Sequence, residues 1–278
     1  VMGITFTALL SMVYLVFCYI QVFYLFGGLG TLPHNYTYAS YAREGFFQLV
    51  AVCFINLILV LGCSEYFRED KILKGILTFI SVCTYIMMLS STYRMILYIQ
   101  VYYLTFLRVF VLWALAVIFL LMSGALIMIY RKNFPYTRYC ITTLTILYLI
   151  FSFAHPDYWI ARYNLSRNEE IDYYYLTRLS LDAAPAIFDH YDKSGLNSDY
   201  WFTEYASRMV KKSYDYQAEE IWVEEGECLP KKQSPRTLNF SRLSSYRRYQ
   251  ECYQLNPDFA MDVEYNIMCY ANDYYGRP

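Results

Sequence analysis

An unbroken apolar run at residues 109–130 constrains the fold of this chain more than any other feature. It contains no charged residue between Arg108 and Arg131. The hydrocarbon core of a bilayer needs roughly 20 apolar residues in a helix, and this run is that long. Further apolar runs lie within residues 1–155. Because no soluble fold needs several such runs in succession, we predict an integral membrane protein.

Five membrane-spanning helices are predicted in the first part of the chain. Turn-forming glycine and proline residues or short charged loops separate most of the apolar runs. The predicted spans are residues 4–26, 45–63, 75–91, 109–130 and 139–154.

A tyrosine-rich stretch, residues 93–108, separates the third and fourth predicted spans. Tyr98 and Tyr102 are four residues apart and therefore share a helix face. Tyrosine rings with one polar tip favour the headgroup level of a bilayer. We therefore predict an interfacial or re-entrant helix here. If the stretch crosses the membrane instead, the chain has six spans and its tail changes side.

Charge is distributed unevenly along the chain, although the net charge is only −1. Residues 1–155 carry nine Lys or Arg and four Asp or Glu, whereas residues 156–278 carry fourteen and twenty. A charge-poor, basic-edged half followed by an acidic half predicts a transmembrane domain at 1–155 and a soluble domain at 156–278.

The soluble domain keeps enough aromatic residues, including Trp201 and Trp222, to form a core. The whole chain is therefore predicted to be an all-α integral membrane protein with a mostly helical soluble C-terminal domain. We also expect a short extended piece within residues 221–240. The predicted helices of this domain are residues 169–179, 183–188, 199–214 and 241–255.

Basic residues give a weak indication of which side of the membrane the tail occupies. The loops at 64–74 and 131–138 share a side and carry six Lys or Arg, against five in the segments of the other side. The side with more basic residues is usually cytoplasmic. The count therefore favours a multi-pass protein of the cell membrane with an extracytoplasmic C-terminal domain.

The chain starts at Val1, already close to an apolar run, and lacks the basic segment and cleavage site of a signal peptide. We therefore expect no signal peptide. The start at Val1 within an apolar run predicts either further sequence upstream or an unusual start codon.

The eight cysteines do not have the spacing of a metal or redox motif. Cysteines in or beside apolar runs are expected to be small buried hydrophobes, and those of the tail leave room for one disulfide. The first group is Cys18, Cys53, Cys63, Cys83 and Cys140, and the second is Cys228, Cys252 and Cys269. We expect no metal and no cofactor.

Five groups of phrases occur in order along the sequence. They are YASYAREGFFQL (38–49) with INL (55–57), YRM (93–95) with LYI (97–99) and LTFLR (104–108), HPDYWIARYN (155–164), YL (175–176) with LSLDAAPA (179–186), and NFSR (239–242). In this order they resemble a bacterial multi-pass membrane family, domain of unknown function 4173, which is allied to 4153. The resemblance covers most of residues 1–190 and extends loosely to about 250. One departure is Tyr103, where the similar segment often has glycine.

The family resemblance implies further membrane helices upstream of this chain. It implies no reaction and no ligand.

Three arginines near the ends of predicted spans form a candidate anion or headgroup site: Arg43, Arg94 and Arg108. Charges near a hydrocarbon core are costly and are often paired or line a pathway. The competing interpretation is that these arginines extend to lipid phosphates and anchor the helix ends. Glu44 is a potential partner for one of them.

Two polar residues lie inside the second span, and a polar cluster closes the last one. Gln48 and Asn56 are eight residues apart, roughly on one helix face, and are expected to bond neighbouring helices.

His155, Asp157 and Arg162 suggest acid–base or metal chemistry. A rigid corner in which Arg162 pairs with Asp157 is the favoured interpretation.

The sequence supplies no nucleophile with a nearby base, so we predict a non-enzymatic protein with no catalytic residue. Its expected role is sensing, binding or scaffolding at the membrane through the C-terminal domain. A transporter or channel component with an arginine-lined polar site is the alternative. The expected partners are the lipid bilayer and a protein or envelope component, and nucleic acid is not expected.

Overall fold

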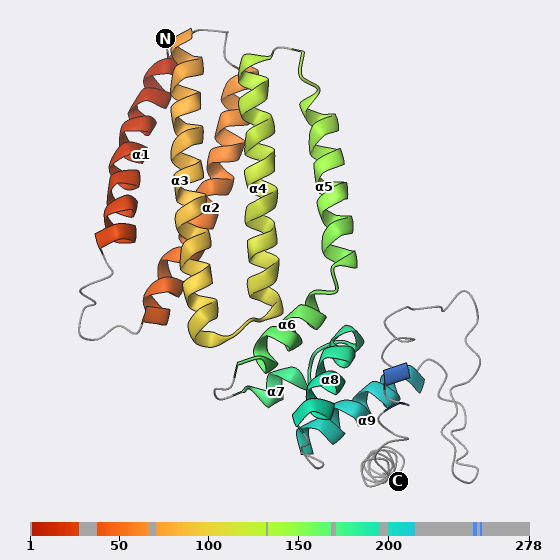
Figure 1. Ribbon diagram of the computed structural model, residues 1–278. Helices are drawn as coiled ribbons and strands as arrows, with labels where there is room; N and C mark the ends of the chain where they lie inside the picture. The colour runs from red at the N-terminus through yellow and green to blue at the C-terminus, as the bar shows by residue number, and fades with distance from the viewer. Residues whose placement is uncertain are drawn as a thin grey trace, which may run out of the picture. The chain divides into compact units, whose positions relative to one another are not determined.

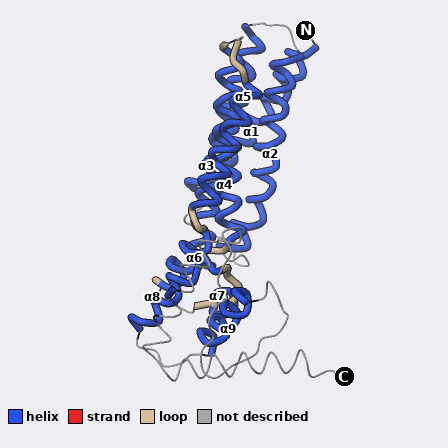
Figure 2. Tube along the Cα trace, turned by 90° about the vertical axis from the view of Figure 1, so that its right-hand side faces the viewer, coloured by secondary structure: helices blue, strands red, loops and turns tan. Residues whose placement is uncertain are grey.

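The computed structural model contains only helices and loops among the residues that it describes (Figures 1 and 2). The chain divides into two compact units, Val1–Ala154 and His155–Pro278. The extended piece predicted within 221–240 and the three tail cysteines lie outside the described residues. The described residues are 2–27, 38–66, 71–131, 133–167, 171–194, 200–214, 247–248 and 251.

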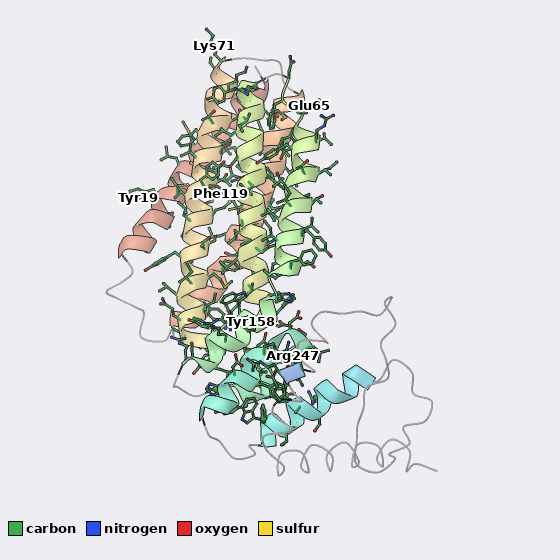
Figure 3. All side chains as sticks on the ribbon, turned by 45° about the vertical axis from the view of Figure 1, so that its right-hand side comes forward. Tyr19, Glu65, Lys71, Phe119, Tyr158 and Arg247 are labelled. Carbon is green, nitrogen blue, oxygen red and sulfur yellow. The ribbon has the colours of Figure 1, made fainter. Side chains whose placement is uncertain are left out.

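The first unit consists of five apolar helices that alternate in direction (Figure 1). Each predicted span overlaps one of them, and most of the helices are longer than predicted. Glu65 and Lys71, at the end of the second helix and the start of the third, lie at one end of this unit (Figure 3). The helices are α1 (Met2–Gly27), α2 (Tyr38–Tyr66), α3 (Lys71–Tyr102), α4 (Phe106–Tyr130) and α5 (Tyr136–Phe153).

Length and composition qualify three of these helices as membrane spans within the described ranges: the Phe46–Glu65 part of α2, α3 and α4. The number rises to four if α5 and the next helix, α6 (Pro156–Leu165), form one broken span. In α1 the apolar segment Thr5–Ile20 is shorter. These spans make the chain a multi-pass membrane protein.

The prediction of a separate interfacial helix at 93–108 is wrong. Residues 93–102 are the last turns of α3, and residues 103–105 alone connect α3 to α4. The reason is local: no glycine or proline lies between Gly75 and Gly124, so nothing interrupts the helix at the tyrosines. The shared face of Tyr98 and Tyr102 is confirmed, because their ring centroids lie 5.0 Å apart.

The 32 residues of α3 also explain how tyrosines reach the headgroup level without a separate helix. A helix of that length is about 48 Å long, whereas a hydrocarbon core is about 30 Å thick. One or both ends of α3 therefore project beyond the core when the helix crosses a bilayer.

Tyr103 ends α3 in the left-handed conformation, with φ of 65°. This conformation is typical of the residue after a helix, where glycine is most common because it has no Cβ. It is also the position at which the resembling family often has glycine. Tyrosine therefore occupies a strained backbone position at the α3–α4 turn.

Helix α3 is the centre of the first unit, because it contacts α1, α2 and α4. Its buried residues recur every three or four positions, which places them along a continuous stripe. Two of its polar side chains bond α4: Tyr85 Oη lies 2.9 Å from Ser123 Oγ, and Thr78 Oγ1 lies 2.8 Å from Tyr130 Oη.

Helix α5 is attached to α4 by aromatic donors that reach backbone carbonyls. Tyr139 Oη donates to the Leu120 carbonyl at 2.8 Å. From the other side, Trp113 Nε1 donates to the Leu147 carbonyl at 3.1 Å. Because hydrocarbon offers no hydrogen-bond partners, such bonds tie α5 to α4 more specifically than apolar contact does.

The outer faces of the first unit expose large apolar side chains. Met12 of α1 is 70% exposed and Phe153 of α5 is 74% exposed. No side chain of α5 is buried. Water would make such a surface prone to association, whereas acyl chains solvate it, which agrees with the candidate spans.

The second unit packs short helices around an aromatic and aliphatic core. Ile160, Ile187, Phe188 and Phe202 are fully buried, and the rings of Phe188 and Phe202 meet edge to face with centroids 5.2 Å apart. The elements after α6 are α7 (Tyr173–Leu176), the 3₁₀ helix η1 (Leu181–Ala183), α8 (Ala184–Ser194) and α9 (Tyr200–Tyr214).

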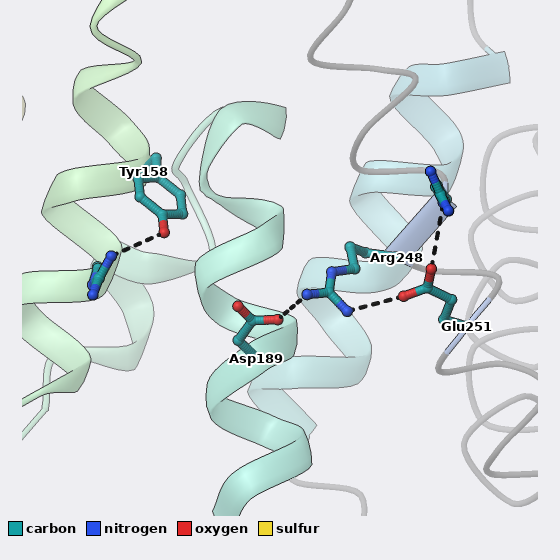
Figure 4. A network of polar contacts seen from close by, with 6 residues as sticks. Tyr158, Asp189, Arg248 and Glu251 are labelled. Atoms are coloured by element: carbon teal, nitrogen blue, oxygen red, sulfur yellow. Dashed lines mark hydrogen bonds and ion pairs between the residues drawn. The ribbon is translucent and has the colours of Figure 1, made fainter.

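The predicted helices at 183–188 and 199–214 are confirmed, whereas only 173–176 of the one at 169–179 is helical in the described part. Of the predicted helix at 241–255, the described residues 247–248 and 251 are helical. Arg248 pairs with Asp189 of α8 at 2.7 Å and with Glu251 at 2.9 Å (Figure 4).

Gly124 of α4 is required by the close approach of α5. A Cβ at this position would lie 2.3 Å from Cε1 of Tyr139. We expect Gly124→Ala to displace Tyr139 and weaken its bond to Leu120, at a cost of about 1–3 kcal/mol. Thermal unfolding of the full chain in detergent measures this.

Gly62→Ala of α2 is the matched control, because a Cβ there meets nothing within 4 Å. Alanine is the better helix former, so this variant should be neutral or slightly stabilised. Equal unfolding temperatures for the two variants would contradict the proposed α4–α5 contact.

Candidate functional site

Five polar residues cluster where the second unit begins, and we call this cluster the exit corner. They are His155, Asp157, Ser180, Asp182 and Tyr205. Helix α6 begins at Pro156, and proline suits a first helical position because its nitrogen has no hydrogen to leave unbonded. His155 precedes it in the left-handed conformation, with φ of 47°.

His155 and Asp182 form the first contact of the exit corner. His155 Nδ1 lies 3.3 Å from Asp182 Oδ1, which ties the start of α6 to η1. Asp182 Oδ1 is buried and accepts no directed hydrogen bond in the described structure. The contact is therefore mainly electrostatic, and it is an ion pair only when the imidazole is protonated. About half of the His155 side chain is exposed.

Ser180 joins the other members of the exit corner through its backbone. Its N–H donates to Asp157 Oδ2 at 3.2 Å, and its carbonyl accepts a hydrogen bond from Tyr205 Oη at 3.0 Å. These two bonds fasten α6 and α9 to the segment before η1.

Tyr205 is buried, and this raises the pKa of its hydroxyl above the usual value of about 10. The negative charges of Asp157 and Asp182 raise the pKa further. The hydroxyl therefore remains a neutral donor to Ser180 at physiological pH.

Arg162 is not part of the exit corner, so the predicted Asp157–Arg162 pair is wrong. Arg162 instead donates to Tyr158 Oη at 3.3 Å (Figure 4) and lies over the Trp159 ring at 5.7 Å. Residues five apart diverge on a helix, whereas residues three or four apart are neighbours. Asp157 consequently faces Ser180, and Arg162 faces the aromatic side.

The exit corner can hold one imidazole in a fixed orientation beside two carboxylates. The sequence predicted His155 and Asp157, but Ser180, Asp182 and Tyr205 were missed. The phrases HPD and LSLD contain four of these five residues, whereas no local signal indicates Tyr205. No group of three or more His, Cys, Asp or Glu side chains among the described residues could hold a metal ion.

The backbone positions of the three candidate arginines lie at the same end of the first unit. Arg43 is near the start of α2, Arg94 is near the end of α3 and Arg108 is near the start of α4 (Figure 1). The side chains of Arg43 and Glu44 lie outside the described part, and Arg94 is half-buried. A shared anion site remains a prediction.

Arg108 already has partners within the chain. Its guanidinium donates to the carbonyls of Tyr102 and Tyr103 and lies 4.3 Å from the centroid of the Tyr98 ring. The last carbonyls of a helix lack intrahelical partners, and a cation near them is favourable. Arg108 therefore has a structural role at the α3–α4 turn.

Gln48 and Asn56 do not share one environment, contrary to the prediction. Gln48 is exposed, whereas Asn56 is 0% exposed and donates through Nδ2 to Thr84 Oγ1 at 2.9 Å. Eight residues rotate a helix by about 80° beyond two full turns, which is enough to move a side chain from the interior to the surface.

Small and polar side chains surround the Asn56–Thr84 bond. Cys53 Sγ lies 4.0 Å from the Thr84 carbonyl, and Cys18 Sγ donates to the Cys83 carbonyl at 3.6 Å. These three cysteines are free and buried, as the sequence predicted, and the same holds for Cys63. The group links α1 and α2 to α3.

Comparison with known families gives a match that covers the first unit and the beginning of the second. The family model described as Domain of unknown function (DUF4153) matches residues 1–190. The chain belongs to this family. The match includes the helical unit and both members of the His155–Asp182 pair, whereas Tyr205 lies beyond it. It is a match to 4153 and not to the allied 4173. Searches of curated proteins and of solved structures found no match.

Asn56 gives a test of whether the buried polar group serves packing. Its Oδ1 is buried without a hydrogen-bond partner, so Asn56→Leu removes an unsatisfied acceptor together with one bond. Thr84→Ala instead leaves the whole amide unpaired. We expect Asn56→Leu to be near neutral and Thr84→Ala to cost about 1–3 kcal/mol, measured by thermal unfolding in detergent. The opposite order of stabilities would contradict a packing role.

Tyr205→Phe tests the exit corner through its pH dependence. At neutral pH the variant should lose about 1 kcal/mol, because the Ser180 carbonyl loses its donor. The folded state holds the Tyr205 proton more tightly than the unfolded chain, so this contribution is full below pH 10 and falls as pH rises above it. The stability difference should therefore shrink and then reverse in alkali.

Hydrogen exchange of residues 200–214 in the full chain measures this difference in stability between the wild type and Tyr205→Phe. The other tyrosines are present in both proteins, so their contribution cancels in the comparison. A difference that does not change with pH would show that Tyr205 is not buried beside the two carboxylates.

Proposed function

We propose that the protein is a non-enzymatic membrane scaffold whose C-terminal unit binds a protein or another envelope component at the membrane surface. The observation that carries this proposal is the exit corner. Two residues after α5 ends, the chain enters a unit whose first helix is fastened to η1 and α9. A unit that begins rigidly is suited to presenting a surface close to a membrane.

The first unit supports an anchoring role. Its buried polar side chains bond neighbouring helices, as in Asn56–Thr84 and Tyr85–Ser123, and Arg108 bonds the end of α3. Polar groups used in this way stabilise a bundle and are not available for a substrate.

We further propose that all five helices of the first unit cross the membrane and that the C-terminal unit is extracytoplasmic. The alternating helix directions support the first point, since they place the end of α2, the start of α3, the end of α4 and the start of α5 at one end of the unit. Arg131, Arg138, Lys71 and Lys74 lie at or near these helix ends, which supports a cytoplasmic location for that end of the unit. The resemblance to family 4173, which is more specific than membership of family 4153, would fit the same arrangement of five crossings.

A transporter or channel component is the second candidate. The location of Arg43, Arg94 and Arg108 at the same end of the first unit favours this candidate. It is also favoured by Asn56 Oδ1 and Ser91 Oγ, which are buried without hydrogen-bond partners in the described structure. The uninterrupted α2, α3 and α4 count against it, because transporter sites usually lie at broken helices. Anion flux into liposomes that contain the full chain, abolished by Arg94→Ala, would favour the transporter.

Photo-cross-linking in living cells tests the scaffold. A benzoyl-phenylalanine replaces Tyr174 of α7, which is 65% exposed, in the full-length protein. We expect adducts with an envelope protein or another envelope component.

The same cross-linker at Ile141 of α5, which is 62% exposed, is the control and should give lipid adducts alone. Identical adducts at the two positions would refute binding by the C-terminal unit. A cytoplasmic partner at position 174 would refute the proposed side of the membrane.

A further inference from the structure

Helix α6 has two faces of different chemistry. Ile160, Ala161 and Leu165 are buried in the second unit. Because each residue turns a helix by about 100°, Trp159 and Arg162 lie on the opposite side. Trp159 is 55% exposed, although tryptophan is among the largest apolar side chains. The exposed face therefore combines a large aromatic ring with a cation.

Arginine and aromatic side chains pair along this face. The Arg162 guanidinium lies 5.7 Å from the Trp159 ring and donates to Tyr158 Oη. One turn further on, the Arg167 guanidinium lies 5.6 Å from the Tyr163 ring. The planar guanidinium carries its N–H donors in a rigid fork, which suits two-pronged binding of a phosphate.

The connection to α5 keeps the start of α6 close to the end of α5. Only Ala154 and His155 separate Phe153 from Pro156, and the three Cα–Cα steps between them span at most about 11 Å. This limit holds for any orientation of the second unit. Helix α5 itself exposes apolar side chains along its length, as expected of a helix in lipid. The first turns of α6 are therefore near the level of the headgroups.

We propose that the face of α6 formed by the exposed Trp159 and Arg162 and the half-buried Tyr163, together with Arg167 just after the helix, binds the phosphates of anionic phospholipid headgroups. The indole ring lies among the glycerol and upper acyl groups, where tryptophan is favoured, and the guanidinium groups bind the phosphates. The inference is independent of the proposed function, since it holds whether or not the C-terminal unit also binds a protein.

Two observations favour lipid over a protein on this face. The cations and aromatic rings alternate along a helix of ten residues, which is a small surface for a protein partner. The face is also close in sequence to α5, a helix whose exposed side chains are largely apolar. A second copy of the chain or another protein is the competing occupant.

The test titrates the full chain, in neutral detergent micelles, with phosphatidylglycerol or with phosphatidylcholine. The readout is the Trp159 emission, obtained as the difference between the wild type and Trp159→Phe. We expect phosphatidylglycerol to shift this emission to the blue at lower lipid content than phosphatidylcholine does. Arg162→Gln should weaken the response to phosphatidylglycerol about five-fold, because one cation near an anionic surface contributes about that factor.

Two further variants separate charge from fold. Arg162→Lys keeps the charge and should retain most of the response. Arg208→Gln of α9 is the control, because Arg208 pairs with Glu204 at 2.7 Å, and it should respond like the wild type. Lipids brominated near the headgroup end of their acyl chains should quench Trp159 in nanodiscs.

Three results would overturn the inference. The first is an equal response of Trp159 to the two lipids. The second is an unchanged response in Arg162→Gln. The third is Trp159 emission that is quenched neither by brominated lipid nor by aqueous acrylamide. This would show that a protein covers the face.

Discussion

The absence of hydrogen-bond partners in hydrocarbon is the constraint on which the first unit depends. A buried polar side chain there is costly unless it bonds its own helix or a neighbour, and among the described side chains of this unit only Asn56 Oδ1 and Ser91 Oγ have no such bond. Helix α3 meets this requirement in several directions, with Thr84 bonded to Asn56 of α2 and Tyr85 to Ser123 of α4. Each bond contributes only about 1 kcal/mol or less, but it has direction, which apolar contact between helices in lipid lacks. The polar residues therefore determine which faces of the helices meet.

Backbone groups at helix ends have a related requirement, and it applies at Tyr103 and His155, where the backbone is left-handed. At Tyr103 the last carbonyls of α3 lack partners within the helix, and Arg108 bonds those of Tyr102 and Tyr103. At His155 the backbone turns into α6, and Asp182 holds the imidazole in place. In both places a strained residue is stabilised by a charged side chain from another element. This pairing fixes the directions in which the chain enters α4 and α6.

Features set by local composition could be predicted from the sequence, whereas those set by packing could not. The apolar runs located all five helices, because length and hydrophobicity decide where a membrane helix forms. Tyr98 and Tyr102 could be paired from their spacing alone. Local spacing failed for Gln48, which faces outward although Asn56 is buried, and for Arg162, which turns away from Asp157. The partners of the exit corner, Asp182 and Tyr205, are distant in sequence, so only the packing of η1 and α9 brings them to α6.

The distribution of polar groups also bears on how the two candidate functions differ. A pathway through the first unit needs polar groups that a solute can reach, but Asn56 is fully buried and Arg108 bonds carbonyls of its own chain. The unsatisfied Asn56 Oδ1 is then a cost of packing, tolerated because the other side of the amide orients α2 on α3. If this is so, an apolar replacement of Asn56 changes stability little and leaves function intact. A carrier would show the reverse, because its intramembrane polar groups would be retained for the solute at the expense of stability.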